Sequence, residues 1–150
     1  MSGSAVSLPS VWAPFDDTDA DVMLRSSDGI DFWVYKVVLA KASSVFRDMF
    51  TFPDTATKRQ VVELTEKANT LEHLLCLCYL VQRLRFASLK AIALVLEAAK
   101  KYAMVSVTIT LGDALLRFKS TEPLRVYALA YTHALTDVAR ASAARSREDP

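Results

Sequence analysis

The sequence predicts an α+β protein with three short strands and several helices. Three observations carry this prediction. Apolar and polar residues alternate between residues 22 and 35 on both sides of an Asp-Gly pair, which is the pattern of a β-hairpin. From Val37 onward apolar residues recur every three or four positions, which is helical spacing. The chain has 150 residues, 52% of them hydrophobic, so it can bury a sizeable core.

Three strands are predicted. Residues 22–25 alternate between two faces, and a return strand from Ile30 to Tyr35 follows Asp28-Gly29, a pair typical of type I′ turns. The alternation places Phe32 and its apolar neighbours on one face of the return strand. One side of the hairpin is therefore expected to belong to the core. A short β-branched run from Val61 to Leu64 predicts the third strand.

The rest of the chain is predicted to be helical. Two short helices between residues 37 and 50 meet at Ser43 and Ser44, and a serine hydroxyl is expected to cap the second. The β-branched stretch 105–110 is assigned to a helix because the helical stripe continues through Phe118. No internal repeat is visible in the sequence. Further helices are expected at residues 69–81, 88–102, 105–118, 123–131 and 136–144.

The charge balance bears on the class of partner. The chain has 18 Lys and Arg against 17 Asp and Glu, a formal charge of +1. Nucleic acids and anionic membrane surfaces require a basic excess, so neither is expected as a direct partner. The mean hydropathy of +0.20 is high for a small domain. This predicts that some apolar surface is reserved for a protein partner.

The cysteines and the first residues of the chain bear on location. Cys76 and Cys78 lie two positions apart in an apolar run, where a helix would place them roughly 200° apart. A disulfide between them is therefore not expected, and reduced thiols fit a cytoplasmic or nuclear protein. The start of the chain has neither the basic nor the apolar region of a signal peptide. We therefore expect an intracellular location.

The residues that could carry chemistry do not form a recognisable site. His73 and Cys76 have the i, i+3 spacing that metal sites use, but two ligands do not complete a zinc site. His133 and Asp137 are expected to form an ordinary surface pair on one helix. No catalytic residue, cofactor or metal is therefore predicted, and the chain is not expected to be an enzyme. A small metal- or thiol-dependent enzyme using His73, Cys76 and Cys78 is kept as the alternative from another class.

Two aromatic residues are candidates for a binding surface. Trp33 and Tyr35 lie on the polar face of the predicted hairpin. They either pack under a following helix or are exposed for a partner, and aromatic anchors are enriched in protein interfaces.

A series of short motifs follows in a specific order. Asp21-Val22 and Phe32 precede the run from Tyr35 to Ala40, and Ser43 to Phe50 comes next. The segments VVEL, LEHLLCLCYL and LKAIALVLEAAKKYAM then follow. With this series the chain resembles the BTB/POZ domain family over about residues 20–118. Residues 119–150 resemble the helical extension common in fungal BTB proteins, and residues 1–19 are expected to form a loose arm.

The resemblance implies a non-catalytic protein–protein interaction module, built as a helical cluster capped by a small three-stranded sheet. Members of the family dimerise or recruit adaptors, so the expected function is self-association, with a homodimer as one state, or adaptor binding. In dimeric members an aspartate and a basic residue matching Asp21 and Lys36 form a charged pair at the interface. Here Tyr35 replaces the usual histidine, and no N-terminal helix is apparent.

The resemblance also implies an alternative partner. Some family members bind cullin-type ubiquitin-ligase scaffolds through an apolar-x-Glu pattern after the second short helix. This chain meets that pattern as Phe52-Pro53-Asp54. Aspartate is one methylene shorter than glutamate, and the proline stiffens the loop. Phe52 and Asp54 are the residues through which an adaptor would bind a cullin.

Overall fold

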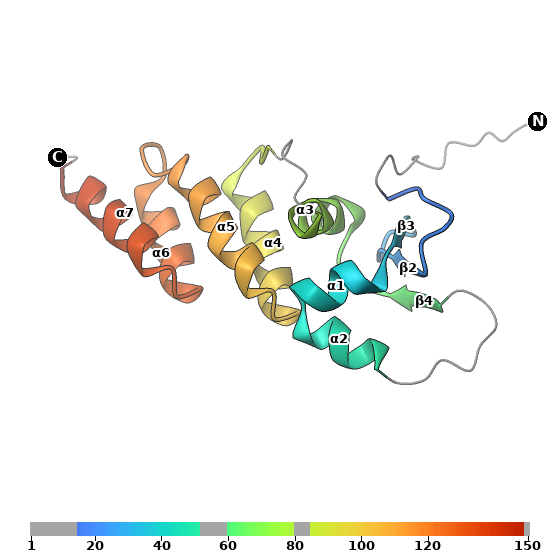
Figure 1. Cartoon of the computed structure of the whole chain (residues 1–150). Helices are drawn as coiled ribbons and strands as arrows, with labels where there is room; N and C mark the ends of the chain where they lie inside the picture. Colours follow the sequence, from blue (N-terminus) through green and yellow to red (C-terminus); the bar gives the residue numbers. More distant parts are fainter. Residues whose placement is uncertain (1–14, 52–59, 80–84, 149–150) are drawn as a thin grey trace, which may run out of the picture. The chain divides into compact units, whose positions relative to one another are not determined.

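The chain divides into two compact units, residues 1–72 and 73–150. The computed structural model describes residues 15–51, 60–79 and 85–148 (Figure 1). Helix α3 runs across the division between the units. The described elements are β2 (Val22–Arg25), β3 (Asp31–Val34), α1 (Lys36–Ala42), α2 (Ser44–Phe50), β4 (Gln60–Glu63), α3 (Ala68–Cys78), α4 (Leu89–Lys101), α5 (Val105–Leu116), α6 (Pro123–Thr132) and α7 (Thr136–Glu148).

The sheet of the first unit has β2 in the centre, with the order β3-β2-β4 (Figure 1). Strands β2 and β3 are antiparallel, with Leu24 opposite Phe32, whereas β4 is parallel to β2. Val22, Leu24 and Phe32 are buried on one face, as the alternation predicted. The predicted α+β class with a small three-stranded sheet is confirmed.

The hairpin turn differs from the predicted type I′ turn. That turn needs a positive φ at both central residues, but only Gly29 has one, at 84°. Instead a five-residue loop is closed by Ser26, whose N–H donates to the Ile30 carbonyl at 2.8 Å and whose hydroxyl accepts from the Ile30 N–H at 2.9 Å. Asp28 Oδ1 accepts from the Ala68 N–H at 2.9 Å, so the turn also caps the first turn of α3.

The segment just before the hairpin is more ordered than the predicted loose arm. The Phe15 side chain is 1% exposed, and its ring meets Phe32 edge to face at 6.0 Å between centroids. The Phe15 carbonyl accepts the Trp33 N–H at 2.9 Å, and Asp16 forms a parallel bridge with Trp33. The buried Phe15 ring and the backbone contacts of Phe15 and Asp16 therefore hold the start of this segment against β3. Residues 1–14 lie outside the described residues.

The two short helices, α1 and α2, meet at Ser43 and Ser44, as the sequence predicted. Ser43 has extended backbone angles, and its hydroxyl accepts the Phe46 N–H at 3.0 Å, which caps α2. The Phe46 side chain is 1% exposed and lies parallel to the Phe50 ring at 5.9 Å between centroids.

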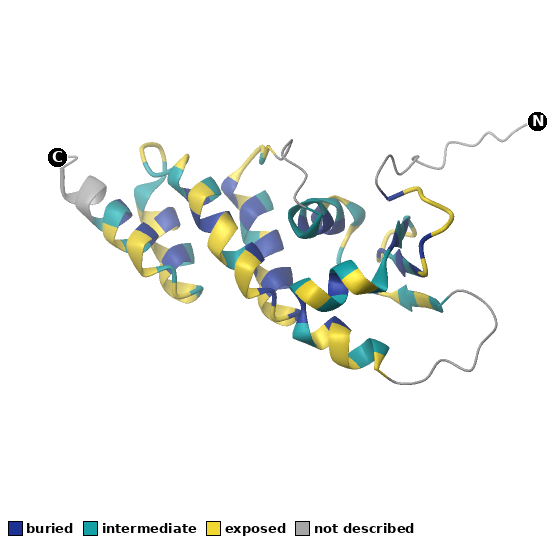
Figure 2. Cartoon of the chain, viewed as in Figure 1, coloured by how far each residue is buried: buried dark blue, intermediate teal, exposed yellow. Residues whose placement is uncertain are grey.

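Helices α4 to α7 of the second unit form two helical hairpins (Figure 1). The β-branched stretch from Val105 is helical, as expected, and Pro123 opens α6. In Figure 2 buried and exposed residues alternate as stripes along α4 and α5. Ser88 caps α4 by accepting the Ala91 N–H at 3.2 Å.

The two hairpins are a structural repeat, although no internal repeat is visible in the sequence. Helix α4 ends at Lys101 and α6 ends 31 residues later, at Thr132. Both are followed by an alanine with left-handed backbone angles: φ is 54° at Ala103 and 58° at Ala134. The next helix begins two residues after each alanine.

The hydrogen bonds at the two turns match as well. The Met104 N–H donates to the Ala99 carbonyl at 2.7 Å, and the Leu135 N–H donates to the Ala130 carbonyl at 2.8 Å. These bonds, with those from Ala103 and Ala134 to the carbonyls three residues earlier, define a Schellman motif at both helix ends. The repeat has a period of 31 residues.

Phe46→Ala is expected to destabilise the protein by about 3–5 kcal/mol, because it removes a fully buried aromatic ring and leaves a cavity. Denaturant unfolding measures the change. An unchanged midpoint would mean that Phe46 does not contribute to the core.

Replacing the left-handed alanines by glycine is expected to stabilise the protein. A Cβ is unfavourable at these angles, so Ala103→Gly and Ala134→Gly should each add about 0.5–1 kcal/mol to the free energy of unfolding. Ala128→Gly, in the exposed interior of α6, is the matched control and should cost about 1 kcal/mol. If all three substitutions destabilised alike, the left-handed turns would not exist in solution.

Candidate protein-interaction sites

The junction of β3 and α1 brings together most of the residues that the sequence singled out. The Tyr35 hydroxyl donates to Asp17, and this hydrogen bond lowers the pKa of the Asp17 carboxyl below its ordinary value. Asp21 Oδ1 accepts the Lys36 N–H at 2.8 Å. Lys36 is the first residue of α1, and Tyr35 makes no side-chain cap there. Asp21 therefore satisfies a helix N–H that has no partner within the helix.

Asp21 and Lys36 are close, but in a different way from a charged pair. The Asp21 carboxylate bonds to the backbone of Lys36, while the Lys36 ammonium lies 5.5 Å from the centroid of the Phe50 ring, over its face. The two residues thus fix the start of α1 and its position against the end of α2. Their part in a protein interface stays a prediction.

Trp33 is neither fully packed nor fully exposed, so it matches neither of the two alternatives that the sequence left open. Its side chain is half-buried, opposite Met23 on β2, and its backbone is held by residues 15 and 16. Tyr35 is also half-buried. Phe52 and Asp54 lie outside the described residues.

The first unit carries exposed apolar residues that the sequence analysis did not single out. Val37 is 59% exposed on α1, directly after Lys36, and Val45 and Val61 are 37% and 42% exposed. Val37 stands off the buried stripe that contains Leu39, so helical periodicity was the available signal.

A metal- or thiol-dependent enzyme would use His73, Cys76 and Cys78. In the described part of the chain these residues do not form a common site. The His73 ring lies on the Phe86 ring, with 4.6 Å between centroids. Burial raises the pKa of the Cys78 thiol to about 12, which keeps it protonated and weakly nucleophilic at neutral pH. Within the described residues, no three His, Cys, Asp or Glu side chains are grouped so that they could hold a metal ion.

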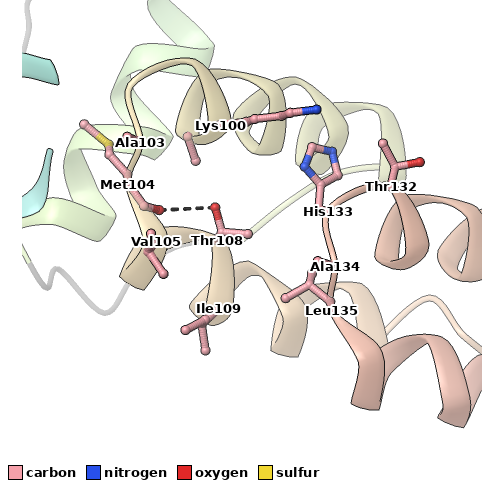
Figure 3. Close-up of a pocket in the computed structure, with 11 residues that line it drawn as sticks. Lys100, Ala103, Met104, Val105, Thr108, Ile109, Thr132, His133, Ala134 and Leu135 are labelled. Carbon is pink, nitrogen blue, oxygen red and sulfur yellow. Dashed lines mark hydrogen bonds between the residues drawn. The ribbon is translucent and has the colours of Figure 1, made fainter. Parts of the chain in front are cut away.

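A groove of about 490 Å³ lies between the two hairpin turns of the second unit (Figure 3). Its walls are mostly apolar, and sequence analysis missed it because the repeat was not visible. The lining residues are Ala99, Lys100, Ala103, Met104, Val105, Thr108, Ile109, Thr132, His133, Ala134 and Leu135.

His133 is the buried polar residue of this groove. Its side chain is 2% exposed, and Nε2 has no hydrogen-bond partner among the described residues. Burial lowers the pKa of the imidazole, a change that Glu97 opposes and Lys100 reinforces. The Glu97 carboxylate lies 3.7 Å from Nε2. The expected surface pair with Asp137 is wrong, because His133 ends α6 and Asp137 belongs to α7.

Among the helices of the described ranges, none has the length and apolar character that crossing a bilayer requires.

The fold and the exposed surfaces define an α+β domain of the kind that binds other proteins. The BTB/POZ domain family matches residues 15–119, more than half of the chain. The chain belongs to the BTB/POZ family, whose domain is a protein–protein interaction module.

A solved structure supports the fold. The chain is similar to the BTB domain of zebrafish PATZ1, with a TM-score of 0.51 and 22% sequence identity, over 66% of this chain and 77% of that one. No curated protein matches the chain.

Acidification is expected to weaken the fold through His133. The folded-state pKa of the imidazole lies below the ordinary 6.5, so the folded protein binds this proton less readily than the unfolded chain. The free energy of unfolding is therefore highest above pH 6.5. It should fall as the pH drops through 6.5 toward the lower pKa of His133 in the folded state. Denaturant unfolding at several values between about pH 5 and 8 measures this slope.

His133→Gln should flatten the dependence of the free energy of unfolding on pH. His73→Gln is the matched control and should keep this dependence. Equal slopes in the wild type and His133→Gln would contradict a buried neutral imidazole.

Proposed function

We propose that this chain is a non-catalytic interaction module that self-associates through the β3–α1 junction, defined here as Asp21, Trp33, Tyr35, Lys36 and Val37. The observation that carries the proposal is the 59% exposure of Val37 beside side chains that are held in fixed positions. An apolar residue exposed on a monomer lowers the free energy when a partner covers it.

The charges of the junction suit a symmetric pair. Asp16, Asp17, Asp19 and Asp21 are exposed before α1, and Lys36 lies at its first residue. A patch that carries both signs can be complementary to itself about a two-fold axis, with the ammonium of one chain facing the carboxylates of the other. The hydrogen bonds from the Lys36 N–H to Asp21 and from the Tyr35 hydroxyl to Asp17 fix these groups in advance, which lowers the entropy cost of association.

Light scattering over a dilution series tests the proposal. A closed dimer would show a mass of about 33 kDa, twice that of the 16.6 kDa chain, and the mass would persist on dilution. Val37→Asp places a charge in the patch and should yield the monomer mass.

Val105→Asp is the matched control, because Val105 is 68% exposed on α5 of the other unit, and this variant should keep the dimer mass. A monomer at every concentration in the wild type would overturn self-association.

An adaptor role for a cullin-type scaffold is the alternative. It is motivated by Phe52-Pro53-Asp54, which follows α2 in the sequence. Capture by a cullin N-terminal domain that Asp54→Ala abolishes would support this role, and no capture by the wild type would exclude it. We place either function inside the cell, where the thiols of Cys76 and Cys78 stay reduced.

A further inference from the structure

The 31-residue repeat shows which face of a hairpin receives the next one. On the first hairpin, Gly112 of α5 meets the second: a Cβ built at Gly112 would lie 3.3 Å from Val138 Cγ2 and 3.7 Å from Leu135. Glu97 of α4 lies near His133, and Lys100 lines the groove with Thr132. Glu97, Lys100 and Gly112 thus mark the stacking face of the first hairpin.

The equivalent face of the second hairpin is found by adding 31 to each number. Glu97, Lys100 and Gly112 correspond to Ala128, Tyr131 and Ala143. Tyr131 is 74% exposed, and Ala128 is exposed as well. Leu124, at 70%, and Tyr127, at 40%, extend the same side of α6 by one turn. These five residues form what we call the outer face: Leu124, Tyr127, Ala128, Tyr131 and Ala143.

The outer face is more apolar than its covered equivalent. The two charged residues of the first stacking face, Glu97 and Lys100, are replaced by Ala128 and Tyr131. The Tyr127 and Tyr131 rings are stacked, with 6.2 Å between centroids, and together present a preformed aromatic surface. An exposed aromatic and aliphatic patch of this kind marks a protein contact, because covering it removes apolar area from water at little entropy cost.

We propose that the outer face binds a helical hairpin of a partner protein, which stacks on α6–α7 as α6–α7 stacks on α4–α5. The internal interface defines the chemistry of the partner. Its contact residues are uncharged and aliphatic, like Leu135 and Val138, and they meet Ala143 where those residues meet Gly112. A small residue at this point lets two helices approach closely, and Ala143 keeps that property.

The repeat favours a hairpin of this type over a second copy of the chain. In each copy the side of α6–α7 that could stack in register is already occupied by its own α4–α5. Two chains that paired through their outer faces would form a different interface. The effect of Tyr131→Lys on a dimer of the unextended protein would detect it. The outer face lies in the second unit and does not depend on the β3–α1 junction.

The test extends the full chain by one repeat. A copy of residues 120–150 is joined directly after Pro150, so that each added residue stands 31 positions after its original. If the outer face accepts a hairpin, the extended protein melts in one transition at a higher temperature than the wild type. Amide hydrogen exchange in α6 slows by about tenfold or more, because adjacent repeats couple through their shared interface.

Tyr131→Lys in the original segment alone is the matched variant. Tyr131 is exposed in the chain itself, so the variant should leave the melting temperature of the unextended protein unchanged. In the extended protein it should abolish both the rise in melting temperature and the protection of α6. This pair of results separates loss of the contact from failure to fold.

Two results would overturn the proposal. One is an added segment that leaves α6 exchange unchanged. The other is an unextended protein that dimerises and becomes monomeric with Tyr131→Lys, which would show that a second copy covers the outer face. A dimer lost with Val37→Asp and kept with Tyr131→Lys concerns only the junction and leaves the outer face available for a partner.

Discussion

The left-handed ends of α4 and α6 are the constraint on which the second unit depends. Each reverses the chain within three residues, so consecutive helices become antiparallel neighbours. An alanine at such a φ costs about 1–2 kcal/mol relative to its relaxed backbone. The Schellman hydrogen bonds offset part of this cost. Burial supplies the rest, since Met104, the residue after the first turn, is 1% exposed.

Exposed carboxylates have a comparable role in the first unit. Asp28 ties the hairpin turn to α3, 40 residues later, and Asp21 holds the start of α1. Ser26 donates to Asp28 at 2.5 Å, and this bond, followed by the one from Ala68, lowers the pKa of the Asp28 carboxyl. Because each carboxylate accepts a backbone N–H at the start of a helix, the helices begin at fixed positions. The exposed apolar residues beside them are fixed as well.

Whether the sequence could predict an interaction depends on how far apart its two residues lie along the chain. The serine cap of α2 acts within one turn and was predicted, as were a helix that begins near Ser88 and one that begins at Pro123. The bond from the Ala68 N–H to Asp28 has no local pattern, and the Asp-Gly pair therefore suggested the wrong turn. The repeat was missed because both turns use alanine, whereas a glycine would have marked the left-handed position. The family motifs identified the fold, but the exposure of Val37 and Tyr131 depends on packing.

The two proposed surfaces differ in the force that would hold a partner. At the β3–α1 junction the exposed Val37 follows Lys36, and the carboxylates of Asp17 and Asp21 are held by Tyr35 and by the Lys36 N–H, so attraction there is electrostatic in part. Such charges are screened within about 10 Å at 0.1 M salt, and association through the junction should weaken as salt is added. The outer face has no charged side chain among its five residues, and its contact would rest on apolar burial. Excluded salts such as sulfate strengthen apolar burial, so the two surfaces should respond to sulfate in opposite directions. Charge at the junction therefore selects a partner by complementarity, whereas the tyrosines of α6 select it by shape.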